Sequence, residues 1–123
     1  MAKSSPDAYY VLVVEDDPII MMSMVDLVEQ AGCLAVEAYS VAEAIAILEV
    51  RADIRTVFTD LDMRGSTARM RFAVAIRDRW PPVELVMVSS RPWAETDVPA
   101  RGVLLGKPFD QHRIVAALRT FAA

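Results

Sequence analysis

The sequence has a single cysteine, Cys33, and a single histidine, His112. One cysteine forms neither an internal disulfide bond nor a cysteine-rich metal cluster, which agrees with a reducing compartment. Cys33 precedes apolar Leu34, so we expect it in the core or at a strand edge rather than as a reactive thiol. His112 lies early in the last predicted helix, and we expect it at the surface without a catalytic role.

The sequence also lacks an apolar run of the roughly 18 residues needed to span a bilayer. Its first eight residues are polar and lack the apolar stretch of a signal peptide. We therefore expect a cytoplasmic protein that does not enter the membrane. With 123 residues, the chain fits a flexible N-terminal tail over residues 1–8 and one domain over residues 9–123.

Basic residues are fewer than acidic ones, and the net charge is −4. Proteins that bind nucleic acids usually carry a basic patch, so we expect no direct contact with nucleic acid. Five arginines nevertheless gather in one region. We interpret them as a solvated helix face, with a partner-binding surface as the alternative; they are Arg64, Arg69, Arg71, Arg77 and Arg79.

Short apolar stretches alternate with segments of helical periodicity. We expect strands over residues 9–14, 34–39, 55–59, 83–88 and 103–105, and helices over 18–31, from 40 onward, over 67–79 and from 110 to 121. Pro92 and Pro99 leave space for little more than two helical turns between the last two strands, so the fourth helix should be short or irregular. Strands alternating with helices predict an α/β fold with a doubly wound, five-stranded parallel sheet.

Several helix ends carry their own signals. Pro18 suits the first helical turn, where Asp17 is favoured as an N-terminal acid. Gly32 is a natural stop for the same helix. Ser40 and Glu43 can form a capping box, and a later Asp110 can cap the last helix.

Polar residues follow the predicted strands where each strand ends. Glu15 and Asp16 follow the first strand, Asp60 the third, Ser89 the fourth and Lys107 the fifth. Right-handed crossovers place the carboxyl ends of parallel strands along one edge of the sheet, where such folds bind ligands. The topology therefore predicts one site built from residues far apart in sequence.

The chemistry of these side chains suits phosphoryl transfer. Crowded carboxylates repel one another, and a cation relieves that repulsion. Oxygen ligands suit Mg²⁺, Lys107 adds an ammonium group, and Ser89 adds a hydroxyl donor. A carboxylate can attack phosphorus and form an aspartyl phosphate. Asp60 is the candidate nucleophile because it follows a buried strand alone, while Glu15 and Asp16 suit the metal.

Together these residues resemble those of the response-regulator receiver domains of two-component signalling. The resemblance covers roughly residues 9–121 and implies a flavodoxin-like sheet with strand order 2-1-3-4-5. It rests on four groups of residues: Val13-Val14-Glu15-Asp16-Asp17-Pro18, Asp60-Leu61-Asp62-Met63, Ser89 and Lys107-Pro108-Phe109.

The resemblance implies a role for each acidic residue. Asp60 would be phosphorylated, and it would share a Mg²⁺ ion with Asp16 as a direct ligand. Glu15 would act on the metal mainly through water, and Asp62 would lend its backbone carbonyl. Ser89 would follow the phosphoryl group.

The resemblance also implies roles for Lys107 and for partner proteins. Lys107 would contact the phosphoryl oxygens, and its bond to Pro108 would be cis. The chain would act as a stand-alone response regulator whose only catalysis is self-phosphorylation and autodephosphorylation at Asp60. A sensor histidine kinase or a phosphotransfer protein would donate the phosphoryl group, and a downstream protein or a homodimer partner would respond to it.

Some residues depart from the family pattern. Arg64 stands where proline is usual and Thr67-Ala68-Arg69 where a Met-Asp-Gly-like turn is common, so the loop after Asp60 should differ in shape or mobility. Leu104 stands at the usual aromatic position, which argues against an aromatic rotamer switch coupled to Ser89. Asp62 and Arg91 occupy variable positions that can tune the lifetime of the phosphate.

Two other functions remain open from the residues. Asp60-Leu61-Asp62 resembles the Asp-x-Asp motif of haloacid-dehalogenase-type phosphatases, although that motif normally ends the first strand and Arg64 replaces its usual Thr or Val. The unusual loop and Leu104 would also suit a receiver-like interaction module that is never phosphorylated.

Overall fold

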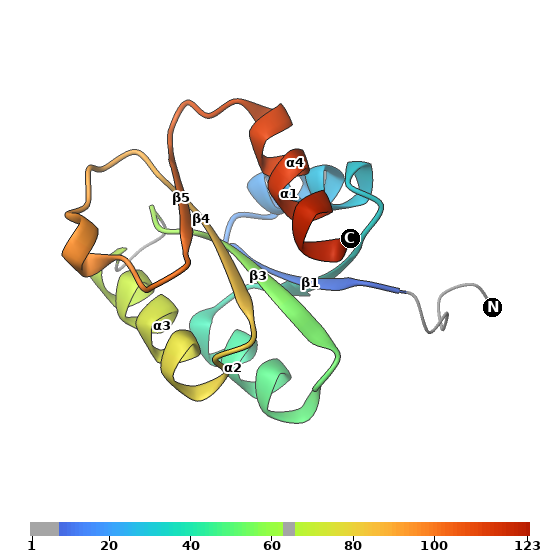
Figure 1. Cartoon of the computed structure of the whole chain (residues 1–123), viewed down its shortest axis with the longest axis horizontal. Helices are drawn as coiled ribbons and strands as arrows, with labels where there is room; N and C mark the ends of the chain where they lie inside the picture. The colour runs from blue at the N-terminus through green and yellow to red at the C-terminus, as the bar shows by residue number, and fades with distance from the viewer. Residues whose placement is uncertain (1–7, 63–65) are drawn as a thin grey trace.

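The computed structural model describes residues 8–62 and 66–123 of the chain. Its centre is one parallel sheet with the order β2-β1-β3-β4-β5 (Figure 1). This arrangement confirms the predicted doubly wound, flavodoxin-like α/β fold. The strands are β1 (Tyr10–Val14), β2 (Leu34–Ala38), β3 (Ile54–Asp60), β4 (Glu84–Ser89) and β5 (Val103–Gly106).

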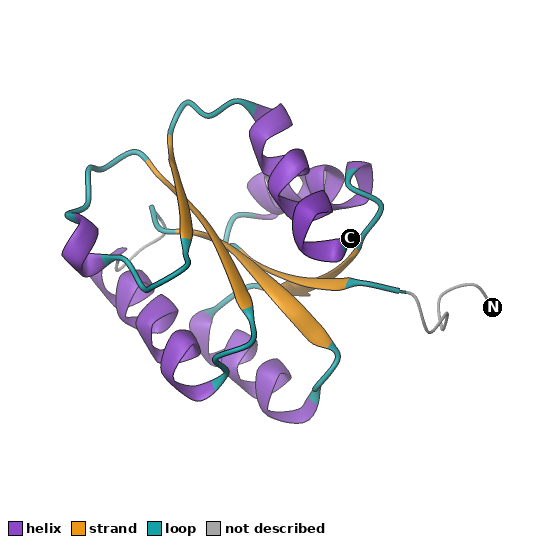
Figure 2. Cartoon of the chain, viewed as in Figure 1, coloured by secondary structure: helices purple, strands orange, loops and turns teal. Residues whose placement is uncertain are grey.

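Helices cover both faces of the sheet (Figure 2). Helices α1 (Pro18–Gln30) and α4 (Gln111–Ala122) pack on one face, and α2 (Val41–Val50) and α3 (Ser66–Arg79) pack on the other. Alternate residues of β1 point to opposite faces, as the pleat of a strand requires. Val11 and Val13 therefore join the core under α1 and α4, while Leu12 and Val14 join the core under α2 and α3.

The predicted helix ends form as expected. The Asp17 carboxylate accepts from the Ile19 N–H at 2.8 Å and caps α1. Gly32 has a φ of +80°, a backbone conformation that favours glycine, directly after the end of α1.

The other two predicted caps are also present. The Ser40 hydroxyl accepts from the Glu43 N–H at 3.1 Å, while the Glu43 carboxylate reaches back to the Tyr39 N–H at 2.8 Å, one residue before the usual position. The Asp110 carboxylate accepts from the His112 N–H at 2.9 Å and caps α4.

The segment between β4 and β5 has no α-helix. It contains a single 3₁₀ turn, η2 (Glu95–Asp97). This confirms the prediction that the helix between the last two strands, the fourth in the predicted order, is short or irregular. Trp93, Thr96 and Asp97 of this segment line a cavity together with Met70 and Val74 of α3, so the segment lies beside α3.

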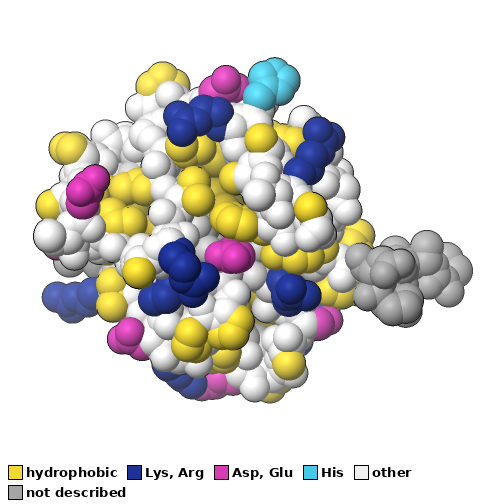
Figure 3. Space-filling model, viewed as in Figure 1, with side chains coloured by type: hydrophobic (Ala, Val, Ile, Leu, Met, Phe, Trp, Pro, Cys, Tyr) yellow, Lys and Arg dark blue, Asp and Glu magenta, His cyan; other side chains and the backbone are white. Residues whose placement is uncertain are grey.

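The surface mixes charged and apolar side chains. On the face seen in Figure 3, Lys and Arg side chains are scattered among acidic and apolar ones. Cys33 is buried and His112 is exposed, as predicted. Within residues 8–62 and 66–123, no helix combines the length and apolar character that crossing a membrane requires. The predicted tail (residues 1–8, of which 1–7 are not described) and the departure at Arg64 lie largely or wholly outside the described residues.

Candidate functional site

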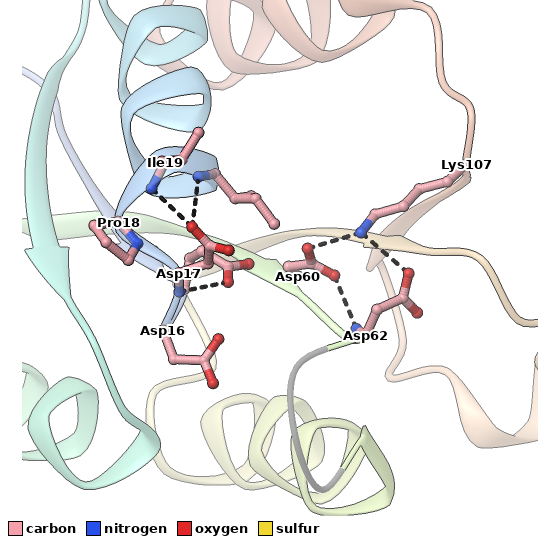
Figure 4. A pocket seen from close by; sticks show the side chains of 9 residues that line it. Asp16, Asp17, Pro18, Ile19, Asp60, Asp62 and Lys107 are labelled. Atoms are coloured by element: carbon pink, nitrogen blue, oxygen red, sulfur yellow. Dashed lines mark hydrogen bonds and ion pairs between the residues drawn. The ribbon is translucent and has the colours of Figure 1, made fainter.

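An acidic cavity opens at the carboxyl edge of the sheet. It has a volume of about 520 Å³, and its walls include Glu15, Asp16, Asp60, Asp62 and Lys107. Asp16 lies on one side of this cavity, Asp62 and Lys107 lie on the other, and Asp60 is between them (Figure 4). The structure thus brings five of the six predicted site residues into one cavity.

Asp60 is the buried centre of the site. Its side chain is only 3% exposed, and its Oδ2 atom lies 2.7 Å from the Lys107 Nζ atom. Its Oδ1 atom accepts from the Asp62 N–H at 2.8 Å. Both carboxylate oxygens of Asp60 are therefore oriented by charged or polar donors.

Lys107 is held in place by the end of β4 and by two carboxylates. Its backbone N–H donates to the Ser89 carbonyl at 2.8 Å, and its bond to Pro108 is cis, as predicted. Its Nζ atom also lies 3.0 Å from the Asp62 Oδ2 atom. Burial alone would lower the pKa of Lys107, but the bonds to Asp60 and Asp62 outweigh it and raise that pKa, so the ammonium form is favoured.

Ser89, the sixth predicted residue, is buried at the end of β4 and is bonded to Asp62. Its Oγ atom donates to the Asp62 Oδ1 atom at 3.0 Å, and the Ser90 N–H donates to the Asp62 Oδ2 atom at 2.8 Å. Burial opposes ionisation of Asp62, but the bonds from Lys107, Ser90 and Ser89 lower its pKa. The sequence analysis gave Asp62 a backbone role at the metal and a position that can tune the lifetime of the phosphate, but it missed this carboxylate network.

Trp93 is a further residue that the sequence did not single out. Its indole N–H donates to the Ser89 Oγ atom at 3.1 Å, and the Arg91 N–H donates to the same atom at 3.1 Å. Leu104, at the usual aromatic position, packs in the same core as Trp93. An aromatic side chain is therefore hydrogen-bonded to Ser89. It belongs to the irregular segment between β4 and β5 and not to β5 itself. The only sequence signal was a tryptophan four residues after a serine that ends a strand.

Glu15 is a buried carboxylate with one unsatisfied oxygen. Its Oε2 atom accepts from the Asp17 N–H at 2.9 Å, while Oε1 is buried without a hydrogen-bond partner. Burial raises the pKa of Glu15 to about 8; the bond from Asp17 acts against this shift, and nearby Asp60 and Asp16 reinforce it. A cation near Glu15 would reverse this preference for the protonated form.

The donor set fits a hard cation that keeps several waters. Asp16 and Asp60 offer carboxylate oxygens, and the unpartnered Oε1 atom of Glu15 is a third oxygen with spare capacity. Among the residues that the structure describes, no three His, Cys, Asp or Glu side chains converge closely enough to hold a metal by themselves. The carboxylates of Asp16 and Asp60 are of the kind that Mg²⁺ uses, since this ion is commonly bound by one or two carboxylates plus water and phosphate oxygens.

The arginine region is not the solvated helix face that the sequence suggested. Arg71 and Arg79 are exposed, but Arg69 is only 6% exposed, and Arg77 donates to the carbonyls of Pro81 and Val83 at 2.7 Å each. The interpretation is therefore wrong for Arg69, while Arg77 is half-buried and hydrogen-bonded to backbone carbonyls. Burial lowers the pKa of Arg69, and the charges of Asp16, Glu15 and Asp60 act against that lowering.

Solved structures of response regulators share this architecture. A response regulator receiver protein from Pseudomonas putida is 26% identical, with a TM-score of 0.76 over 92% of this chain and 97% of that one. A response regulator receiver protein from Sinorhizobium medicae is 24% identical, with a TM-score of 0.81 over 96% of this chain and 97% of that one. A CheY-like receiver domain protein from Methanospirillum hungatei has a TM-score of 0.76 at 15% identity and covers 94% of both chains.

A comparison with curated proteins gave no match to this chain. The family model described as the response regulator receiver domain, however, matches residues 11–119. That span includes all five strands except the first residue of β1, and it includes every residue of the acidic cavity. This chain belongs to the response regulator receiver domain family.

Proposed function

We propose that the chain accepts a phosphoryl group on Asp60 and signals through a protein contact that depends on this modification. The observation that carries the proposal is the buried Asp60 carboxylate held by Lys107 at 2.7 Å inside an acidic cavity. A sensor histidine kinase or a phosphotransfer protein is the donor, as is general for receiver domains of two-component systems.

The reaction is an in-line displacement at phosphorus. A carboxylate oxygen of Asp60 forms a bond to phosphorus, while the bond from phosphorus to the donor's imidazole nitrogen breaks and that nitrogen keeps the electron pair. Lys107 is placed to follow the new charge, because its ammonium group already touches Asp60 and Asp62. The fixed positive charge stabilises the transferring group without reorganisation.

We further propose that the site uses Mg²⁺. Asp16, Asp60 and the Asp62 backbone carbonyl would hold the ion, with Glu15 acting through water. When bound, Mg²⁺ neutralises charge on the phosphoryl oxygens. The residues of the chain orient the nucleophile through the Asp62 N–H and keep Lys107 beside it.

Ser89 is connected to the phosphorylation site through its hydrogen bond to Asp62. Its hydroxyl donates to Asp62, which shares Lys107 with Asp60, so new charge on Asp60 can draw both Lys107 and Ser89 toward it. The chain would catalyse only its own phosphorylation and dephosphorylation, with no turnover of small phosphate esters.

An apolar rim beside the cavity suits docking of the donor protein. Ile19 and Ile20 line the cavity mouth and are 75% and 40% exposed, and Met22 on α1 is 73% exposed. Contiguous exposed apolar residues mark interaction sites more often than chance surface. A donor domain could cover this rim while its phosphohistidine reaches Asp60.

The first prediction concerns the site of modification. Incubation with Mg²⁺ and acetyl phosphate should add one phosphoryl group to the wild-type protein, as measured by intact mass. Asp60→Asn should abolish the mass shift because it removes the nucleophile, whereas Asp78→Asn, at an exposed position on α3, should leave it unchanged. A shift that persists in Asp60→Asn would rule out Asp60 as the acceptor.

A further inference from the structure

The side chain of Asp62 is bonded to the two residues that would receive a phosphoryl group on Asp60. Its Oδ1 atom accepts from the Ser89 hydroxyl at 3.0 Å, and its Oδ2 atom lies 3.0 Å from the Lys107 Nζ atom. Its Oδ2 atom also accepts from the Ser90 N–H at 2.8 Å. Figure 4 shows this carboxylate beside Asp60, on the side of the cavity where Lys107 lies. An anionic group of the chain itself thus occupies these three donors.

The Ser89 hydroxyl has a single hydrogen to give. A serine hydroxyl donates one hydrogen bond and has two acceptor lone pairs. Its Oγ atom accepts from the Arg91 N–H and from the Trp93 indole N–H at 3.1 Å each, and its hydrogen is directed to Asp62. Ser89 therefore cannot donate to a phosphoryl oxygen while it donates to Asp62.

Charge makes the two occupants exclusive as well. The carboxylates of Asp60 and Asp62 share the Lys107 ammonium group at 2.7 Å and 3.0 Å, so they are close neighbours. Phosphorylation would add nearly two negative charges beside Asp62, and like charges at a partly buried site repel one another strongly. The Asp62 side chain is 20% exposed and lines the open cavity, so it has a path to water when it is displaced.

We propose that the Asp62 carboxylate is a resident competitor of the phosphoryl group, which holds the Ser89 and Lys107 donors in the unmodified chain and releases them when Asp60 is phosphorylated. This inference rests on the proposed function, because it concerns the same site. Displacing Asp62 offsets part of the free energy that the phosphoryl group gains from these donors. The chain therefore binds a phosphoryl group less tightly than it would without a carboxylate at this position.

The test is a titration of the full chain with beryllofluoride, an analogue of the phosphoryl group, in saturating Mg²⁺ and read by fluorine NMR. Asp62→Ala removes the competitor and leaves the Ser89 and Ser90 donors without this acceptor. It should bind beryllofluoride about tenfold more tightly than wild type. Asp62→Asn removes the charge but keeps an acceptor oxygen, so its affinity should fall between those of wild type and Asp62→Ala.

Asp17→Asn is the matched control for loss of charge. Asp17 also lines the cavity, but its carboxylate accepts from the N–H groups of Ile19 and Ile20 at the start of α1. Asparagine caps helices as well as aspartate does, so the fold should be kept. Because Asp17 is exposed, its charge is screened, and Asp17→Asn should change the affinity for beryllofluoride less than about twofold.

The carboxyl carbon of Asp62 reports the displacement directly in the wild-type protein. Its NMR signal should shift when beryllofluoride binds, because the carboxylate loses its bonds to Ser89 and Ser90. A purely structural role of Asp62 would leave both the signal and these bonds unchanged.

Equal or weaker beryllofluoride binding by a folded Asp62→Ala protein overturns the proposal, and so does equal tightening by Asp17→Asn. If Asp62→Ala does not fold, Asp62→Asn replaces it and must bind more tightly than wild type. Phosphorylation by acetyl phosphate, read by intact mass, separates this inference from the proposed function. A wild-type protein that is phosphorylated on Asp60, while Asp62→Ala leaves the affinity unchanged, contradicts only the role of Asp62. Absence of beryllofluoride binding and of phosphorylation in every variant contradicts both.

Discussion

At the scale of single residues, burial affects the protonation of the acidic side chains as much as neighbouring charges do. Glu15 is 2% exposed and follows a strand whose last four residues are fully buried. This burial raises the pKa of Glu15, so its carboxyl group favours the protonated form when no cation is bound. Asp62 is the opposite case, because three donors favour its ionised form. Two carboxylates of one site thus have opposite preferences at neutral pH.

The second prediction follows from Glu15. Its pKa is raised to about 8 in the folded chain from an ordinary value of 4.5, so the folded state binds more protons than the unfolded state between these two values. Without metal, the contribution of Glu15 to stability should be fully present below pH 4.5 and should be lost as pH rises through about 8. Urea unfolding in EDTA from pH 5 to pH 8 measures this loss.

Glu15→Gln is the control for that measurement, because the amide cannot titrate. The free energy of unfolding should fall less steeply with pH in Glu15→Gln than in wild type. Parallel curves for the two proteins would show that Glu15 does not titrate in this range. Saturating Mg²⁺ should reverse the trend for wild type, since bound metal favours the ionised carboxylate.

At the scale of elements, the link between the site and the surface runs through the end of β4. Ser89 donates to Asp62 and accepts from the Trp93 indole, so one hydroxyl joins the acidic cavity to the segment that contains η2. Trp93 also lines the cavity of about 500 Å³ between this segment and α3. We therefore expect a change at Ser89 to reach α3 through Trp93, without the aromatic residue that the family usually carries at the position of Leu104.

The third prediction concerns this link. In a Trp80→Phe background, Trp93 is the only tryptophan, and its emission should change when beryllofluoride occupies the phosphorylation site. The reason is that Ser89 would exchange its bond to Asp62 for one to the phosphoryl analogue, which alters the bond from the indole. Fluorescence titration measures the change.

Ser89→Ala is the decisive variant for that link. It removes the acceptor of the Trp93 indole and should cost about 1 kcal/mol of unfolding free energy, as for one hydrogen bond. Its Trp93 emission should no longer respond to beryllofluoride, although NMR shifts at Asp60 still report binding. An unchanged response in Ser89→Ala would place the coupling elsewhere.

At the scale of the whole molecule, the acidic cavity and an apolar rim occupy the same edge. The rim consists of Ile19, Ile20 and Met22 at the start of α1, next to the loop that carries Asp16. Val50, at the end of α2 on the opposite face of the sheet, is 81% exposed and does not line the acidic cavity. We expect the rim to meet the protein that delivers a phosphoryl group to Asp60.

The fourth prediction separates protein donors from small ones. Met22→Glu should slow phosphotransfer from a phosphorylated histidine-containing donor domain by about tenfold, the loss expected for a charge buried in an apolar contact. Its phosphorylation by acetyl phosphate should stay within about twofold of wild type. Val50→Glu should change neither rate. Equal slowing by Met22→Glu and Val50→Glu would remove the rim as the donor surface.

Most strands and helix caps could be predicted from local sequence signals. The residues that meet at the acidic site could be predicted from the order of the strands. Apolar strands, caps such as Asp17 and Asp110, and a glycine stop at residue 32 depend mainly on neighbours within a few residues, so the sequence reveals them directly. Parallel topology then brings the strand ends together, which is why Asp60 and Lys107 could be paired across 47 positions.

The sequence by itself determined which elements form and which strand ends share one edge, because periodicity and capping are local and the handedness of crossovers is general. Only the tertiary structure decided that Asp62 works through its carboxylate, that Trp93 reaches Ser89, and that Arg69 turns inward while Arg71 turns out. Helix α3 is rich in arginine, so its pattern does not say which arginine is buried. That choice depends on how the helix packs against the sheet, which the pattern of one helix does not contain.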